Sequence, residues 1–146
     1  MTLTPIASSL IILAHSMVAT YFGIEPASVP PIKGAYTVPT DQFTQVCGQN
    51  CQPPSSAIYN IAPQKIYIGV KPYYKERFIF SQLLHETVHH FQAQMTNSQS
   101  NDPTCKNFEE WKALSLQGVY LKSKGAKWFD SYLTEARKTF NNGKCN

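Results

Sequence analysis

Charged side chains are scarce in this sequence. Asp, Glu, Lys and Arg make up 15% of the 146 residues, and the formal net charge is only +4. No run of Lys or Arg indicates a nucleic-acid surface, and a solvated basic face accounts for so small an excess. Because 42% of the residues are hydrophobic, the composition is typical of a globular protein rather than a disordered one. We therefore predict one domain, residues 1–146, with a modest core and no nucleic-acid partner.

Long hydrophobic runs are missing as well. The continuous apolar run from Leu10 to Ala14 is much shorter than the ~20 residues that a membrane-spanning helix needs. No Lys or Arg precedes it, although a signal peptide would require one. We interpret residues 4–23 as a core helix, with Thr4 as its cap and Pro5 in its first turn. Any signal peptide of an exported precursor is expected to have been removed.

The cysteines are few but even in number, at positions 47, 51, 105 and 145. An even count in a small chain indicates an oxidising compartment, so we expect a secreted or periplasmic protein. Three pairings are possible, and we favour Cys47–Cys51 and Cys105–Cys145. The alternative is a second, structural zinc held by four cysteines, for which the spacing is poor.

The residues that suggest chemistry are concentrated in one stretch, residues 85–89, with the pattern His-Glu-x-x-His. The surrounding segment, residues 76–95, is predicted to be a helix because its apolar residues recur at spacings of three and four: Phe80, Leu84, Val88, Phe91 and Met95. Residues four apart share one helix face, so His85 and His89 can present imidazole nitrogens to one metal ion. This is the zinc-protease pattern, in which Glu86 serves as the general base. The alternative is an amphipathic helix with two surface histidines.

A catalytic zinc ion of this kind needs a third protein ligand, commonly a carboxylate. After a polar, turn-rich loop at residues 97–103, a second helix is predicted from about Lys106, and it carries Glu109 and Glu110. A helix, a loop and a helix can bring either glutamate to the two histidines. The other glutamate would then be a solvated acid in the first turn, which the helix dipole favours.

This arrangement resembles the gluzincin metallopeptidases, a large group with His-Glu-x-x-His on one helix and a glutamate ligand on the next. Glu109 and Glu110 both follow His89 at a spacing that the group uses. Many gluzincins carry a small residue three positions after the ligand, where the two helices approach, and Ala113 stands three positions after Glu110. The resemblance therefore favours Glu110 over Glu109 as the third zinc ligand, beside His85 and His89.

A wider part of the chain is similar to a family of small, exported bacterial zincin-like proteins. The similar pieces are residues 65–68, residues 84–92, Cys105 and residues 110–117. The sequence departs from that pattern at Lys112, where another acid would be expected.

The resemblance implies an α+β, zincin-like fold, with a small antiparallel or mixed sheet packed on the active-site helix, a third-ligand helix and terminal helices. The sequence predicts a strand at residues 32–38, with Gly34 at a possible bulge, and a hairpin of residues 57–61 and 65–70. A short helix is expected at residues 40–48 and a last helix at residues 127–140. Gluzincins bind extended peptides along the edge strand of the sheet, and the sequence leaves open which strand that is.

The sequence therefore predicts a zinc-dependent metallopeptidase that hydrolyses a peptide or protein substrate through a zinc-bound water activated by Glu86. Such an enzyme also needs a group that stabilises the oxyanion. The candidates are one histidine and four tyrosines: His15, Tyr67, Tyr73, Tyr74 and Tyr120. The alternative is a zinc-binding protein without peptidase activity that acts as a binding or interaction module.

Overall fold

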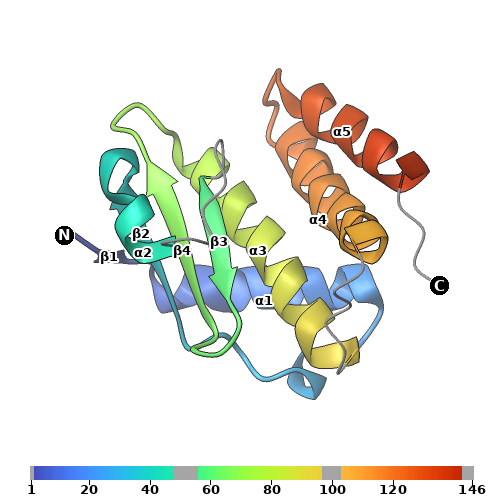
Figure 1. Cartoon of the computed structure of the whole chain (residues 1–146), viewed down its shortest axis with the longest axis horizontal. Coiled ribbons are helices and arrows are strands. Elements are labelled where there is room, and N and C mark those ends of the chain that lie inside the picture. The colour runs from blue at the N-terminus through green and yellow to red at the C-terminus, as the bar shows by residue number, and fades with distance from the viewer. Residues whose placement is uncertain (1, 48–55, 97–102, 143–146) are drawn as a thin grey trace.

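The computed structural model describes residues 2–47, 56–96 and 103–142 (Figure 1). Its four-stranded sheet has the order β1-β2-β4-β3. The strands are β1 (Thr4–Pro5), β2 (Gly34–Pro39), β3 (Ala57–Asn60) and β4 (Lys65–Val70). The helices are α1 (Ser8–Phe22), η1 (Pro26–Ser28), η2 (Thr40–Gln42), α2 (Thr44–Cys47), α3 (Glu76–Thr96), α4 (Pro103–Ser123) and α5 (Phe129–Asn142). The α+β class predicted from the sequence is confirmed, with a sheet that mixes parallel and antiparallel pairs.

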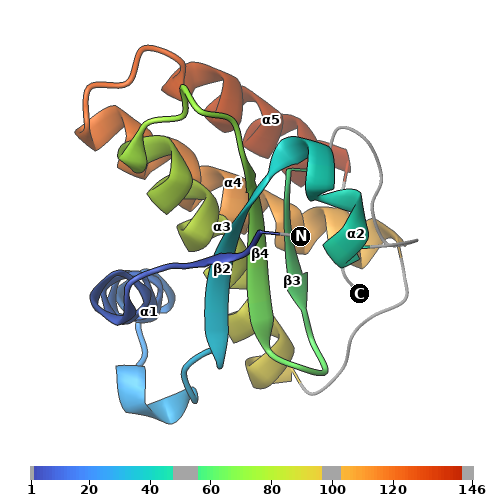
Figure 2. The same cartoon turned by 90° about the vertical axis from the view of Figure 1, so that its left-hand side faces the viewer.

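The sheet and helices form successive layers. Figure 1 shows the sheet on the left, α3 in the middle, and α4 and α5 to the right, while Figure 2 shows the sheet in front of these helices. Helix α3 packs against β3 and β4 on one side and against α4 on the other, and α1 also packs against it. Helix α3 is therefore the central helix, with the sheet on one side and α4 on the other.

Side chains alternate between the two faces of the sheet, as the pleat of a β-strand requires. Ala35 of β2 and Ile66 and Ile68 of β4 are buried on the face that α1 and α3 cover. Val38 lies on the opposite face, where it packs with Phe43 in a smaller apolar cluster. The main core thus lies between the sheet and α3.

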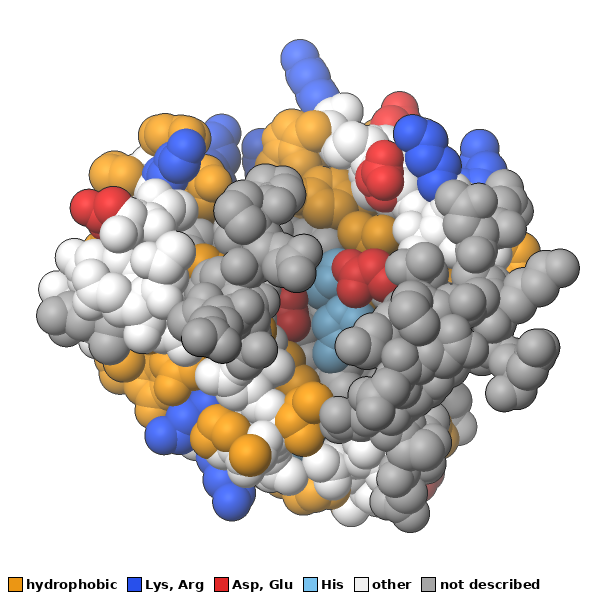
Figure 3. Space-filling view, viewed as in Figure 1, with side chains coloured by type: hydrophobic (Ala, Val, Ile, Leu, Met, Phe, Trp, Pro, Cys, Tyr) orange, Lys and Arg blue, Asp and Glu red, His pale blue; other side chains and the backbone are white. Residues whose placement is uncertain are grey.

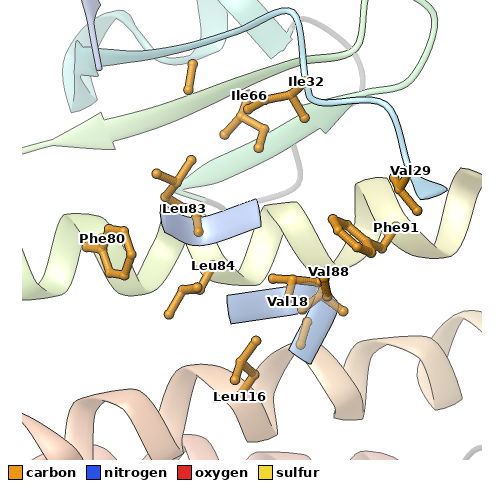
Figure 4. Close-up of a cluster of buried hydrophobic side chains, with 14 of the residues drawn as sticks. Val18, Val29, Ile32, Ile66, Phe80, Leu83, Leu84, Val88, Phe91 and Leu116 are labelled. Atoms are coloured by element: carbon orange, nitrogen blue, oxygen red, sulfur yellow. The ribbon is translucent and has the colours of Figure 1, made fainter. Parts of the chain in front are cut away.

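Helix α3 has an apolar face of five buried side chains: Phe80, Leu83, Leu84, Val88 and Phe91. Figure 4 shows Leu83 on the side of Ile66 in the sheet and Leu84 on the side of Leu116 in α4. Each such side chain stabilises the fold by about 1.5–3 kcal/mol when fully buried. The sequence pattern placed Met95 on the same face, which is wrong: its side chain is 46% exposed, one turn beyond Phe91 at the end of the helix.

The N-terminal segment differs from the prediction of a helix that starts at Thr4. Thr4 and Pro5 form the edge strand β1, which pairs with β2, and the N–H of Ile6 donates to the carbonyl of Ala35 at 2.8 Å. These bonds to β2 delay the start of α1 until Ser8. Proline suits an edge strand because it has no N–H to contribute to a ladder. The predicted end of the helix is confirmed, since Gly23 has the left-handed φ of 68° of a helix C-cap.

The predicted hairpin is confirmed, because β3 and β4 pair antiparallel. The bulge proposed at Gly34 is wrong, since β2 and β4 pair in parallel without interruption from Gly34 to Pro39. The glycine instead makes room for a neighbouring ring, because a Cβ at this position would lie 2.9 Å from the hydroxyl oxygen of Tyr36.

The C-terminal half consists of two antiparallel helices, α4 and α5. Helix α4 begins at Pro103, a few residues before the predicted start, and proline is favoured in the first turn because it lacks an N–H. The predicted break between the helices is confirmed at Gly125, whose φ is 71°. All four cysteine side chains fall outside the described part of the chain, so the disulfide pairing stays a prediction. No helix in the described ranges is long and apolar enough to cross a membrane.

Candidate metal centre

Helices α3 and α4 bring three potential metal ligands together. The Nε2 atom of His85 lies 2.8 Å from Oε1 of Glu110, and Nε2 of His89 lies 2.9 Å from Oε2 of the same carboxylate. One ligand atom from each residue lies within 4.8 Å of the other two. Zinc binds imidazole nitrogen and carboxylate oxygen at about 2.0–2.2 Å, so one ion could contact all three after small side-chain rotations. The residues therefore fit a single metal ion.

The local geometry follows from helix periodicity. His85 and His89 are one turn apart on α3 and point from one face. On α4, Glu110, Ala113 and Gln117 likewise share a face, because they are spaced by three and four residues. The Ala113 side chain is completely buried, and a residue this small allows the two helices to lie close enough for Glu110 to reach both imidazoles.

A buried glutamine sets the proton position on His85. The Oε1 atom of Gln117 lies 2.9 Å from Nδ1 of His85, and the Gln117 amide nitrogen donates to the Ser81 hydroxyl at 3.1 Å. Ser81 in turn donates to the carbonyl of Phe78, so it accepts from the amide, and this orients Gln117 with its oxygen toward the imidazole. Because an amide oxygen only accepts, Nδ1 of His85 carries a proton, and in the neutral imidazole the Nε2 lone pair faces Glu110.

The second histidine has the same kind of partner. Oε1 of Gln92, one turn further along α3, lies 2.9 Å from Nδ1 of His89. The proton of a neutral His89 therefore also resides on Nδ1, and its Nε2 lone pair also faces Glu110. Hydrogen bonds of this kind, from the imidazole nitrogen that does not bind metal, orient the ligands of metal centres.

This arrangement requires positive charge between the three ligands. Two neutral imidazoles would direct lone pairs at the oxygens of Glu110, which repel them at 2.8 and 2.9 Å. Protons on the two Nε2 atoms supply this charge, and a divalent cation between the three groups would supply it as well.

The pKa values of the three residues also favour positive charge on the two histidines. Burial by itself lowers the pKa of His89, but its hydrogen bond to Glu110 and the charges of Glu86 and Glu110 raise it to about 9. Burial also opposes the charged form of His85, yet Glu110 raises its pKa above the usual value. Burial favours protonated Glu110, but the two histidines hold its pKa well below the usual range. The site thus stabilises a carboxylate surrounded by cationic groups.

Glu86 lies beside the three ligands but has a different environment. Its side chain is buried, and burial raises its pKa, although the neighbouring histidines partly oppose this rise. The backbone N–H of Tyr59 in β3 donates a hydrogen bond to its carboxylate. A carboxylate with a raised pKa takes up a proton more readily, which suits a general base.

The side chain of Tyr59 is held by a second buried histidine. The Tyr59 hydroxyl lies 2.7 Å from Nδ1 of His90, whose Nε2 lies 2.7 Å from the carbonyl of Pro30. Since a carbonyl only accepts, Nε2 carries the proton of neutral His90, and Nδ1 accepts from the tyrosine hydroxyl. His90 is fully buried, and burial lowers its pKa. Tyr59 thus joins α3 to the sheet through its side chain and its backbone.

The centre opens to the surface. Figure 3 shows histidine and acidic side chains at the bottom of a hollow on one face of the molecule. The Glu110 side chain is 38% exposed, whereas that of His85 is 10% exposed. A small molecule can therefore approach the ligands from solvent on the side of Glu110.

The structure brings together four of the predicted site residues: His85, Glu86, His89 and Glu110. The side chain of the alternative ligand Glu109 lies outside the described residues. The described contacts of the oxyanion candidates lie elsewhere. His15 bonds the Pro26 carbonyl. The tyrosines contact other rings or apolar groups: Tyr67 in the cluster of Val38 and Phe43, Tyr73 against Tyr74, Tyr74 against Phe78, and Tyr120 against Phe80.

The sequence interpretation missed the roles of Gln92, Gln117, Tyr59 and His90. Helical spacing could have predicted the roles of the two glutamines. Gln92 is one turn after His89 and Gln117 is two turns after Glu110, so each lies on the same helix face as a potential ligand. The contact of Tyr59 with α3 has no such signal, since it depends on how the hairpin packs against the helix.

Comparisons of this chain with protein-family models, with curated protein sequences and with solved structures found no match.

Proposed function

We propose that this protein is a zinc-dependent metallopeptidase with zinc ligands His85, His89 and Glu110. The observation that carries the proposal is the convergence of two imidazole nitrogens and one carboxylate, each imidazole oriented by a glutamine, next to a buried carboxylate that is free of the ligand set. Two histidines, one glutamate and a separate glutamate base form a donor set typical of catalytic zinc.

When bound, zinc supplies Lewis acidity: it lowers the pKa of a water molecule toward neutrality and polarises a carbonyl group. Glu86 accepts the proton of the attacking water and delivers it to the leaving amine nitrogen, so that the carboxylate ends the cycle ionised. The raised pKa of Glu86 suits both transfers, and the Tyr59 N–H holds the carboxylate in place.

The position of β3 supports a peptide substrate. In the described sheet, β3 is an edge strand, because only β4 pairs with it. The Tyr59 N–H that bonds Glu86 points away from β4, so this open edge faces the catalytic carboxylate. An extended peptide that adds to such an edge is held by backbone hydrogen bonds, and here it would lie beside Glu86.

The test compares the zinc-loaded protein with its Glu86→Gln variant on casein and on a peptide library, with and without chelator. The variant should keep its zinc and lose activity by about two to four orders of magnitude, because an amide cannot accept the water proton. Full hydrolysis by Glu86→Gln would contradict the mechanism. The absence of cleavage by the zinc-loaded wild type would contradict the peptidase proposal itself.

A second candidate function is a zinc-binding module without peptidase activity. One observation favours it: the described contacts of all five oxyanion candidates lie away from the three ligands. Zinc bound at full occupancy without any cleavage of the library would select this alternative.

A further inference from the structure

A second pocket lies at the beginning of α3, outside the ligand set. It has a volume of 320 Å³ and is lined by six residues: Tyr73, Tyr74, Lys75, Arg77, Phe78 and Trp128. The loop before α3, the first turn of α3 and the residue before α5 together form it. Its volume is at the small end of the roughly 300–1,000 Å³ of ligand pockets, which suits one large side chain better than an oligosaccharide.

The pocket wall is a row of aromatic rings that contact one another edge to face. The ring centroids of Tyr74 and Phe78 are 4.8 Å apart, and those of Phe78 and Trp128 are 5.3 Å apart. The Tyr73 side chain at the rim is 72% exposed and that of Trp128 is 38% exposed. Such a wall favours an aromatic or large aliphatic group, because rings gain from edge-to-face contact beyond the area that they bury.

The charge of the pocket is of one sign. Among its lining residues, Lys75 and Arg77 are cationic and none is acidic. A carboxylate is the acceptor that a guanidinium group binds best. The pocket therefore favours a guest that carries a carboxylate next to its apolar group.

The pocket is aligned with the metal centre along α3. Phe78 precedes His85 by about two helical turns, so the two residues share a face and lie roughly 10 Å apart along the axis. An extended peptide covers that distance in about three residues. In Figure 3, hydrophobic side chains gather above the hollow that contains the histidines, between the start of α3 and the turn that joins α4 to α5.

We propose that this pocket is a substrate subsite that binds an aromatic or large aliphatic side chain with a neighbouring carboxylate, about three residues from the cleaved bond. The assignment to a substrate rests on the proposed peptidase function. The assignment of the guest rests on the aromatic wall and on the two cations that line the pocket.

Binding is tested first, on the full chain and without reference to activity. The probes are N-acetyl-phenylalanine, its amide and N-acetyl-serine, and the readout is the NMR signal of each tryptophan indole. The chain has two tryptophans, so Trp111 serves as an internal reference for Trp128. We expect N-acetyl-phenylalanine to shift Trp128 selectively and to bind roughly five- to tenfold more tightly than its amide, because only the acid pairs with the cations. The same selective shift of Trp128 in the presence of a chelator would show that the probe binds away from the metal centre.

Variants make the binding test specific. Arg77→Gln should remove the difference between the acid and the amide, while Tyr21→Ser, which changes an exposed ring on α1, should leave it intact. An equal response to N-acetyl-serine would overturn the proposal. So would a Trp128 shift caused by a chitin oligosaccharide but not by N-acetyl-phenylalanine.

Cleavage then tests the link to the metal centre. Peptide pairs carry Phe-Glu or Ser-Glu, with the variable residue three positions before or after the cleaved bond. In one of the two pairs, we expect the kcat/KM of the Phe peptide to be at least tenfold higher than that of the Ser peptide. In Tyr73→Ser and Arg77→Gln this ratio of the two kcat/KM values should fall toward one. Efficient cleavage with a ratio of one in the wild type would overturn the subsite and leave the peptidase proposal standing. Selective binding at Trp128 without any cleavage would overturn the peptidase proposal and the subsite role, but not the pocket as a binding site.

Discussion

The side-chain oxygen of Gln117 on α4 lies 2.9 Å from Nδ1 of His85 on α3. This bond spans the two helices that supply the metal ligands, and it orients His85 with Nε2 toward Glu110. Gln117 is buried and also donates to Ser81. Gln117 thus connects the two helices and orients one potential metal ligand without belonging to the ligand group itself.

The first prediction concerns this orienting residue. Gln117→Leu should lower zinc affinity by about 10–100-fold, because His85 loses the acceptor that sets its tautomer and ring orientation. Gln117→Glu keeps an acceptor and should recover most of that affinity. A competition titration with a chromogenic chelator measures both variants. Wild-type affinity in Gln117→Leu would refute the orienting role.

The second prediction concerns the bond between Tyr59 and His90. Tyr59→Phe removes the donor and leaves Nδ1 of buried His90 without its partner, which should lower the free energy of unfolding by about 1–3 kcal/mol. Urea unfolding measures this value. Tyr73→Phe is the matched control. The Tyr73 ring is exposed, so this variant should change the free energy of unfolding by no more than about 0.5 kcal/mol. Equal stability of the two variants would show that the Tyr59 bond contributes nothing.

The third prediction separates the two neighbouring glutamates. Glu110→Ala leaves two nitrogens for the metal, so zinc content after reconstitution and dialysis should fall from one equivalent to below roughly a third of an equivalent. Glu109→Ala should retain zinc and cost at most about 1 kcal/mol of stability, as expected for an acid near a helix N-terminus. Elemental analysis measures both. Zinc lost from the Glu109 variant and kept by the Glu110 variant would move the ligand by one residue.

The fourth prediction concerns the cysteines and the compartment. We expect the disulfides Cys47–Cys51 and Cys105–Cys145, so thiol titration of the unreduced, denatured protein should detect essentially no free thiol. Peptide mapping would then identify the pairs. Four titratable thiols would contradict both the pairing and the proposal of an exported protein.

Local sequence patterns predicted much of the helical framework and three of the site residues. The apolar spacing around Leu84 and Val88 predicted α3, and the four-residue spacing of His85 and His89 predicted their common face. These features depend on contacts within one helix turn, and helix geometry alone determines them. The hairpin of β3 and β4 was equally accessible, because a short turn between two β-rich segments specifies it.

The start of α1 was not predictable in this way. Thr4 and Pro5 have the local signature of a helix start, but in the folded chain they pair with β2, and the N–H of Ile6 bonds the carbonyl of Ala35. Strand pairing between segments so far apart in sequence overrides a weak local preference.

The sequence by itself determined that His85 and His89 share one face of a helix, because their four-residue spacing matches the helical repeat, and that Glu86 directly follows His85. Only the tertiary structure decided what surrounds them. The packing of α4 on α3 brings Glu110 to both imidazoles and Gln117 to His85, and the packing of the hairpin brings the backbone of Tyr59 to Glu86. These contacts join residues that are far apart in the chain. They depend on how closely the helices and strands approach one another, and side-chain volumes, such as the small volume of Ala113, determine that distance.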